Sequence, residues 1–270
     1  MNILINFADE NFRSKQKVNS YTAKHFGGFD EICEFTPNDI DSDFIKVNKD
    51  IFDQKRGFGY WLWKPYFILK VLEKSNEGDY IFYCDSGSFF VNNIDHLIKS
   101  MGKAKAEIML FETPLIECQW TNQYLFDALN LNDDKYRLTN QISATYILIK
   151  KTNETVTFIK EYLSLCSNIN FVTDKQKVKS KMVIDHRHDQ SILSLLAKSK
   201  NIKPFKDPSD YGVYPFRYFT NDRLFRVNKY EEKYPVIVLS NRNVNPIMYY
   251  LKYWLRTIQS KLSRLSYINV

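Results

Sequence analysis

The sequence predicts an α/β fold, namely one domain over residues 1–245 with a mixed, mainly parallel sheet, followed by a C-terminal amphipathic helix within 246–270. Three observations lead to this prediction. Apolar strand-like segments alternate with helix-like segments, as in sheets that carry helices on both faces. The 270 residues are 44% hydrophobic and 26% charged, as in ordinary globular proteins. The last 38 residues differ from the rest in charge and periodicity.

The individual elements follow from apolar runs and from residues that break or begin helices. Apolar runs that end in polar turns predict strands at 3–7, 31–36, 79–84, 107–111, 143–149 and 236–239. Amphipathic stretches between them predict helices at 14–26, 39–53, 66–74, 94–101, 121–131, 153–166 and 189–200. Gly27 and Gly28 end the first helix, and Pro65 suits the first turn of the third. The polar, lysine-rich stretch 168–181 predicts a loop.

The formal net charge of +7 comes almost entirely from the C-terminal end. Residues 1–232 contain 32 basic and 31 acidic residues, whereas 233–270 contain six basic residues and no acidic one. A nucleic-acid-binding surface would more often spread its basic residues over one face of the domain. We therefore expect no nucleic-acid partner.

The C-terminal segment has helical periodicity. Its apolar residues recur on one stripe of a helix, formed by Ile247, Leu251, Trp254, Leu255, Ile258, Leu262 and Leu265. A basic amphipathic helix over 246–266 can lie in the interface of an anionic membrane. Alternatively, the stripe can pack against the domain and leave the charges in water. The absence of acidic residues favours the membrane.

Cysteines and hydropathy predict the compartment. The four cysteines are scattered without a Cys-x-x-Cys pair, so neither a disulfide framework nor a zinc ribbon is indicated. No apolar run reaches the length of a transmembrane helix, and the first residues lack the pattern of a signal peptide. We expect a cytoplasmic protein that is peripheral at the inner face of the plasma membrane if its tail binds lipid.

Two carboxylates directly follow predicted strands. Ligands of open α/β sheets bind beyond the carboxyl ends of the strands, so Asp9 and Asp85 are candidates for contacts with ribose or with a cation that carries a diphosphate. Each carboxylate could instead accept backbone hydrogen bonds in a local turn. For Asp9 the two interpretations have equal support. For Asp85 the apolar strand that runs straight into it favours a functional role.

The most unusual segment is Arg-Gly-Phe-Gly-Tyr-Trp-Leu-Trp-Lys-Pro at 56–65. Its glycines allow close approach of the backbone to a ligand, and a helix N-terminus beside Lys64 favours an anion. Tyr60, Trp61 and Trp63 are suited to stack on a base or a sugar ring. The glycine spacing does not complete a dinucleotide-binding fingerprint. The aromatic residues could alternatively form a hydrophobic staple at the helix entrance.

A third candidate cluster is His186-Arg187-His188-Asp189, just before the last predicted helix of the domain. Asp189 is suited to cap that helix. In the functional interpretation, this carboxylate with His188 beside it could deprotonate an acceptor hydroxyl. The two histidines are too close for a helical i, i+4 metal pair, so a zinc site is only weakly indicated.

Taken in order, three motifs resemble those of bacterial glycosyltransferases of the GT-A type, which build capsule, O-antigen and other surface glycans. They are the segment at 56–65, Gly-Asp-Tyr-Ile-Phe-Tyr-Cys-Asp-Ser-Gly at 78–87 and Arg-His-Asp-Gln-Ser-Ile at 187–192. The resemblance covers about residues 1–245 and implies a GT-A-like, Rossmann-like domain. It implies a nucleotide-sugar donor over the N-terminal half of the sheet and a glycan or lipid-linked acceptor against the C-terminal half.

The resemblance also implies roles for the acidic residues. Asp85 matches the first acid of the family's Asp-x-Asp signature, which contacts ribose and a Mn²⁺ or Mg²⁺ ion. Gly87 stands in place of the second acid, so the usual principal metal ligand is missing. Asp189 matches the family acid near the acceptor, which acts as general base if the reaction inverts the anomeric carbon and as a positioning residue if it retains it.

Cationic side chains are expected to neutralise the diphosphate. Where many such enzymes have a late histidine, this chain has Ser-Asn-Arg-Asn at 240–243, so Arg242 is suited to neutralise the diphosphate directly. Lys64 and Arg56 can do so from the other side and stabilise the departing nucleotide.

We therefore expect a glycosyltransferase with Asp189 and His188 as catalytic residues. The expected donor-binding residues are Asp9, Arg56, Tyr60, Trp63, Lys64, Asp85 and Arg242. The alternative is a noncatalytic glycan- or nucleotide-binding protein on the same scaffold, which the missing second acid and the missing late histidine favour.

Overall fold

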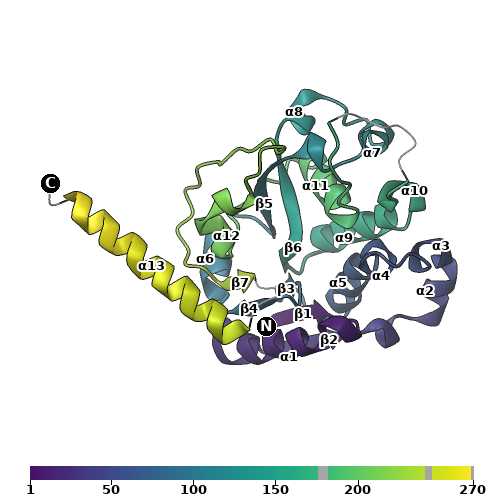
Figure 1. Cartoon of the computed structure of the whole chain (residues 1–270). Coiled ribbons are helices and arrows are strands. Elements are labelled where there is room, and N and C mark those ends of the chain that lie inside the picture. The colour runs from purple at the N-terminus through teal and green to yellow at the C-terminus, as the bar shows by residue number, and fades with distance from the viewer. Residues whose placement is uncertain (176–181, 241–244, 269–270) are drawn as a thin grey trace.

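A five-stranded sheet with the strand order β2-β1-β3-β6-β5 forms the centre of the molecule (Figure 1). The computed structural model describes the backbone of residues 1–175, 182–240 and 245–268, and side chains up to residue 259. Strand β1 is parallel to β2 and β3, whereas β6 is antiparallel to both β3 and β5, so four of the five strands point the same way. The predicted mixed, mainly parallel sheet is confirmed. Its strands are β1 (Asn2–Phe7), β2 (Glu31–Phe35), β3 (Tyr80–Cys84), β5 (Ile108–Ile116) and β6 (Asn140–Lys150).

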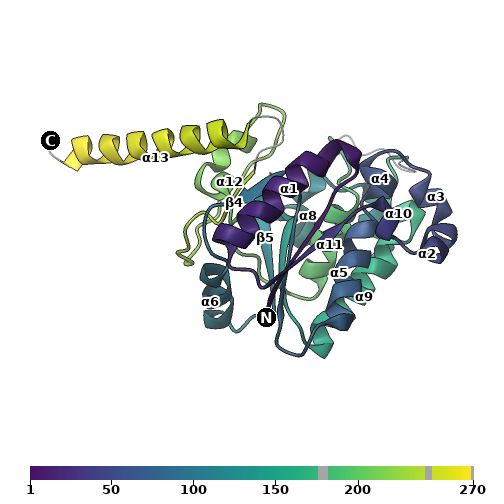
Figure 2. The same ribbon diagram turned by 90° about the horizontal axis from the view of Figure 1, so that it is seen from below.

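Helices cover both faces of this sheet (Figures 1 and 2). Because side chains alternate along a strand, Ile3 and Ile5 of β1 point to one face and Leu4 to the other. The first face packs against α5 (Trp63–Lys74), α9 (Asn153–Cys166) and α11 (Asp189–Ser199). The second face packs against α6 (Asp95–Lys103) and against Ala23, in the turn that directly follows α1 (Arg13–Thr22). The core is therefore split into two apolar layers by the sheet.

The remaining elements are short and connect these layers. The helices are α2 (Ser42–Val47), α3 (Lys49–Phe52), α4 (Gly57–Tyr60), α7 (Gln123–Ala128), α8 (Asp134–Arg137), α10 (Ile169–Val172) and α12 (Asp210–Val213). A π-helical turn at Ala23–Gly27 extends α1, and 3-10 turns lie at Glu10–Phe12, Pro37–Asp39, Glu117–Gln119 and Pro215–Tyr218.

Several predicted elements differ from the observed ones for local reasons. The predicted helix at 39–53 is interrupted at Asn48, whose side-chain amide donates to the carbonyl of Phe44 and closes α2. Residues 236–239 do not extend the central sheet. Instead β7 (Val238–Ser240) pairs with β4 (Ser88–Phe90) in a separate antiparallel ribbon. The one-turn helix α10 lies inside the predicted loop at 168–181, of which residues 176–181 are outside the described part.

The C-terminal helix α13 (Pro246–Ile268) projects from the body of the molecule (Figures 1 and 2). Its first turns are held by Tyr249 and Tyr253, which pack beside Phe89 and Leu239. The apolar stripe itself does not pack on the domain, since Leu255 is 60% exposed and the other stripe residues up to Ile258 are exposed as well. The interpretation of a stripe buried against the domain is therefore wrong for these residues. Within the described residues, no helix combines the length and apolar character needed to cross a bilayer.

Candidate functional site

The side chain of Lys64 is buried between two carboxylates at the carboxyl end of β3. Its Nζ lies 2.8 Å from Asp189 Oδ2 and 3.7 Å from Asp85 Oδ1, and it donates to the carbonyl of Ala144 on β6. Lys64 is only 3% exposed. The first turn of α5, the tip of β3 and the start of α11 thus meet in one cluster of charges, which we call the Lys64 cluster (Lys64, Asp85 and Asp189).

Two tyrosines complete the hydrogen bonding of this cluster. The hydroxyl of Tyr83 in β3 donates to Asp85 Oδ1 over 2.6 Å, and that of Tyr162 in α9 donates to Asp189 Oδ2 over 3.3 Å. Burial alone would lower the pKa of Lys64, but the carboxylates of Asp189 and Asp85 outweigh burial and leave this pKa above its usual value. The ammonium group is therefore a fixed positive charge beneath the strand ends.

The segment before α5 forms a left-handed turn. All five residues from 57 to 61 have positive φ, although three of them are not glycine. The turn is closed by hydrogen bonds from the amide of Tyr60 to the carbonyl of Arg56 and from the amide of Trp61 to the carbonyl of Gly57. This conformation costs roughly 1–2 kcal/mol per non-glycine residue, so the surrounding structure must stabilise it. Such strain is typical of functional sites.

The left-handed turn forms one wall of a pocket of about 230 Å³ beside Asp85, which we call the aromatic pocket. The indole of Trp63 stacks on Phe7 with ring centroids 3.8 Å apart, and its Nε1 donates to the carbonyl of Gly57. The pocket combines flat apolar walls with a carboxylate at its rim, as a nucleoside or sugar requires. Its lining includes Phe7, Asp9, Phe58, Trp61, Trp63, Tyr83, Asp85 and Gly87.

His188 and Tyr60 do not line this pocket. His188 is 1% exposed, its ring stacks on Tyr60 and Trp61, and its Nδ1 donates to the carbonyl of Val172 over 2.6 Å. Burial lowers the pKa of His188 to about 4. The structure thus corrects the expectation of direct chemistry by His188 and of ring stacking by Tyr60. Both side chains instead hold the left-handed turn against α11.

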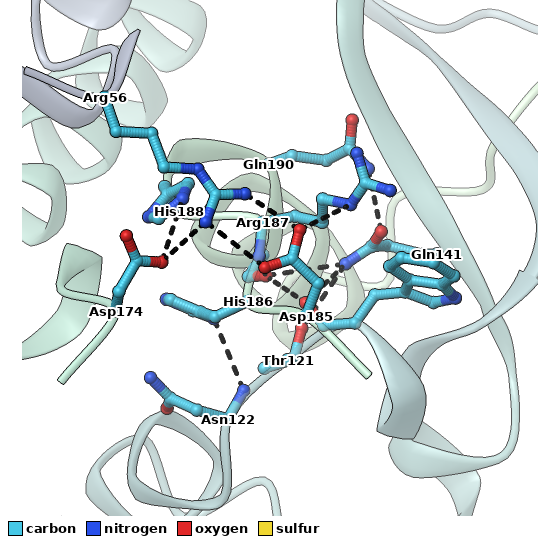
Figure 3. Close-up of polar contacts among 12 residues, drawn as sticks. Arg56, Thr121, Asn122, Gln141, Asp174, Asp185, His186, Arg187, His188 and Gln190 are labelled. Carbon is cyan, nitrogen blue, oxygen red and sulfur yellow. Dashed lines mark hydrogen bonds and ion pairs between the residues drawn. The ribbon is translucent and has the colours of Figure 1, made fainter. Parts of the chain in front are cut away.

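Arg56 also does not line the aromatic pocket, and its guanidinium reaches Asp174 and Asp185 in the segment before α11 (Figure 3). Its guanidinium pairs with Asp185 and with Asp174, each over 2.8 Å. The hydrogen bond to Asp185 raises the pKa of Arg56, with burial opposing it. The guanidinium of Arg56, which we expected at the diphosphate, is thus already paired with two carboxylates of the chain. In this structure Arg56 connects the 56–65 motif to Asp174 and to Asp185, which lies just before the 187–192 motif.

Asp9 lies in the aromatic pocket and also makes the local turn considered for it. Its Oδ1 accepts from the amide of Phe12 over 3.2 Å, so the local turn is present. The same side chain lines the pocket, and its contact with a ligand stays a prediction. Arg242 falls outside the described residues.

The residues present do not by themselves fit a divalent-cation site. Magnesium and manganese prefer several oxygen ligands, and at the tip of β3 the side chain that supplies carboxylate oxygens is Asp85, already paired with Tyr83 and Lys64. Gly87 has no side chain to add. Among the described residues, no group of three or more histidine, cysteine or acidic side chains is arranged to hold a metal.

Several residues of the site have no recognisable signal in the sequence. Tyr83 and Tyr162 occupy strand and helix positions where an aromatic residue reads as core, and both are almost fully buried. Phe7 ends an apolar strand in the same way. Only the hydroxyl contacts with Asp85 and Asp189 distinguish the tyrosines from packing residues.

The fold and the site together define an α/β protein with a buried charge cluster and an aromatic pocket at the carboxyl ends of its strands. No family model matches the chain, and no curated protein matches it. The structure is similar to that of mouse xyloside xylosyltransferase 1 in the apo form, with 10% identity and a TM-score of 0.49, over 91% of this chain and 100% of that chain.

Two structures of the glycosyltransferase GlyE from Streptococcus pneumoniae TIGR4 are also similar. The apo form has 15% identity and a TM-score of 0.43, over 90% of this chain and 55% of that chain. The other has 14% identity and a TM-score of 0.42, over 91% of this chain and 56% of that chain. The chain thus spans about half the length of GlyE. At these identities and scores the likeness assigns no activity to this chain.

Proposed function

We propose that the protein is a glycosyltransferase that moves a sugar from a nucleotide diphosphate to a glycan or lipid-linked acceptor in surface polysaccharide synthesis. One observation carries the proposal, namely that Lys64 of one motif that resembles GT-A enzymes pairs with Asp85 of another, and Asp85 lines the aromatic pocket. Asp189 of the third motif joins them through Lys64. A nucleoside in the pocket would place the sugar over this cluster.

The cluster supplies two kinds of chemistry to such a substrate. Asp85, partly exposed at the pocket rim, can accept hydrogen bonds from ribose or sugar hydroxyls. The fixed charge of Lys64 favours negative charge that develops on the departing diphosphate, although its Nζ is shared with two carboxylates. Asp189 acts as general base if the anomeric carbon inverts and positions the sugar through Lys64 if it is retained. The noncatalytic alternative keeps the same pocket and lacks the transfer.

Asp85→Asn is expected to lower transfer at least a hundredfold, because the neutral amide oxygen attracts the Lys64 ammonium more weakly than a carboxylate does and the charge that orients the sugar is lost. The measurement is a titration with a panel of UDP, GDP, CMP and dTDP sugars, followed by analysis of products with candidate glycans. The matched control is Asp41→Asn. Asp41 also pairs with a tyrosine hydroxyl and a lysine, Tyr66 and Lys70, but lies outside the pocket.

Three outcomes are informative. Loss of transfer in Asp85→Asn with normal transfer in Asp41→Asn supports the enzyme. Binding of a nucleotide sugar without hydrolysis or transfer to any acceptor supports the noncatalytic module. Near-normal transfer by folded Asp85→Asn removes Asp85 from the site.

We further propose that α13 lies on an anionic membrane and brings the site to a lipid-linked acceptor. Its stripe is exposed, with Ile247 at 71% and Leu251 at 51%, and an apolar groove joins the start of the helix to Tyr21 and Phe26 of the first helical segment. Basic residues Lys252 and Arg256 are exposed on the same helix. Aromatic and aliphatic side chains beside unopposed basic charge match an anionic lipid interface.

Co-sedimentation with vesicles tests this proposal. We expect the full chain to bind vesicles that contain phosphatidylglycerol and the chain without 246–270 not to bind. Lys252→Gln with Arg256→Gln should weaken binding by about 1 kcal/mol per removed charge, and only on anionic vesicles. Lys46→Gln, an exposed lysine on α2, is the control. Equal sedimentation of the full and truncated chains would rule out the helix as the anchor.

A further inference from the structure

A second pocket, of about 540 Å³, opens beside the Lys64 cluster on the side of β6. Its lining contains three arginines among many hydroxyl groups, and we call it the arginine pocket. The pocket adjoins the candidate site directly, because Gln190 follows Asp189 in α11 and the carbonyl of Thr145 accepts from the amide of Asp85. Its polar lining includes Thr113, Ser143, Thr145, Arg187, Gln190, Ser209, Arg217, Arg223 and Ser240.

Each of the three guanidinium groups lies over an aromatic ring, and that of Arg217 is 4.0 Å from the ring centroid of Tyr211. Arg187 lies 4.4 Å and Arg223 5.3 Å from the ring centroid of Trp120, which is itself buried. Figure 3 shows Arg187 beside the contact network of Asp185. Stacking restricts the planar guanidinium, so less freedom is lost when it binds a carboxylate or phosphate through paired hydrogen bonds.

The three arginines of the arginine pocket differ in whether a carboxylate pairs with them. Arg217 pairs with Asp210, and Arg187 Nε lies 3.7 Å from Asp185 Oδ2. Arg223 donates to the carbonyl of Tyr218 over 2.9 Å, and among the ion pairs of the described residues it has no carboxylate partner. Its Nε is buried without a hydrogen-bond partner within the described part of the chain. This guanidinium is therefore the group best placed to receive an anion.

One carboxylate shares the pocket but does not neutralise Arg223. Asp207 accepts from the amide of Ser209 over 2.7 Å and is almost fully buried. Burial raises the pKa of Asp207 to about 6, which places it near half-protonation in mildly acidic solution. The lining thus offers a net positive charge together with several neutral donors and acceptors.

We propose that the arginine pocket is the acceptor subsite and that it recognises a sugar carrying a carboxylate or a phosphate, with Arg223 as the main anion contact. Hydroxyl and amide side chains such as Ser143 and Gln190 face the same pocket and suit the remaining hydroxyls of a sugar. The assignment rests on the proposed function in that it names the acceptor of the same site. An acidic sugar seated there would lie next to the start of α11, because Gln190 of the pocket lining directly follows Asp189.

Binding to the full chain tests the proposal without any transfer. Glucuronate and glucose 6-phosphate are compared with glucose by titration, followed by calorimetry or ligand-observed NMR, at low and at high salt. We expect at least tenfold tighter binding of the two charged sugars than of glucose, lost at high salt. Arg223→Gln should lower their affinity at least tenfold and leave glucose unchanged.

The matched control is Arg137→Gln, because Arg137 also lies over an aromatic ring, 5.1 Å from the centroid of Phe126, but outside the arginine pocket. This variant should bind the charged sugars normally. Equal affinity for charged and neutral sugars, or unchanged affinity in folded Arg223→Gln, would overturn the proposal.

A competition experiment distinguishes whether the arginine pocket binds the acceptor or the donor diphosphate. If UDP or GDP displaces glucuronate and inorganic phosphate does so equally well, the arginines bind the donor and the acceptor assignment fails. If the acidic sugar binds through Arg223 while no nucleotide binds, the proposed glycosyltransferase function is wrong. The proposed acidic-sugar site is then still supported. Joint binding of a nucleotide and the acidic sugar supports both.

Discussion

Lys64→Met is expected to destabilise the protein by about 3–5 kcal/mol, because it removes the cation from between two carboxylates and leaves Asp189 buried and unpaired. Asp85 is partly exposed, so the loss of its ion pair with Lys64 costs less stability than that of Asp189. Methionine keeps the length of the side chain, so the loss reports charge more than volume. Urea unfolding followed by fluorescence measures the change as a lower midpoint at constant slope.

Two further variants make the Lys64 prediction specific. Lys70→Met removes a lysine from the same helix that pairs with Asp41 at the surface, and we expect a loss below about 1 kcal/mol. Lys64→Met with Asp189→Asn should recover part of the stability of the single variant, because the uncompensated buried charge is gone. If Lys64→Met and Lys70→Met unfold at the same urea concentration, the buried cluster contributes little to the fold.

Periodicity accounts for most of the framework. Strands β1, β2 and β3 and helices α5, α9 and α11 each have one strongly apolar face or run, and all of them lie close to their predicted positions. The ribbon of β4 and β7 could not be predicted in the same way. Its three-residue strands are too short for a period to show, and they pair across about 150 residues of chain.

The chemistry of the site was harder to predict than its location. The motifs predicted a site around Lys64, Asp85 and Asp189, and the structure brings these three side chains together where strand ends and helix starts converge. The orientation of Arg56 and His188 depends on tertiary packing that no local pattern encodes. An imidazole of ordinary pKa is a good base, whereas burial against two aromatic rings makes His188 a neutral packing residue.

The left-handed turn could not be predicted from the sequence for a related reason. Glycines at 57 and 59 suggested an unusual backbone, but Phe58, Tyr60 and Trp61 share their positive φ, which such residues rarely adopt. Tertiary contacts with His188 hold Tyr60 and Trp61 in place. A prediction from local preference would therefore reject the conformation that builds the aromatic pocket.

Gly57→Ala is the second substitution with a large expected effect. A methyl group on Gly57, whose φ is +61°, would lie 2.3 Å from the indole of Trp61, so the ring must leave the wall of the aromatic pocket. We expect a stability loss of about 1–2 kcal/mol from the left-handed backbone alone. Loss of the stacking wall should lower nucleotide-sugar affinity by at least about tenfold, equivalent to about 1.4 kcal/mol.

Two other glycines separate backbone strain from the clash with Trp61. Gly78 has φ of +87° with no atom within 4 Å of an added methyl, so Gly78→Ala should cost stability through the backbone and leave nucleotide affinity unchanged. Gly102 lies in α6 with the same free space and no positive φ, so Gly102→Ala should stabilise the protein by about 0.5–1 kcal/mol. Unfolding in urea and nucleotide-sugar titration are measured for all three. If Gly57→Ala binds the nucleotide as tightly as Gly78→Ala does, Trp61 does not form the binding wall, because the strain common to both variants would then explain every effect of the substitution.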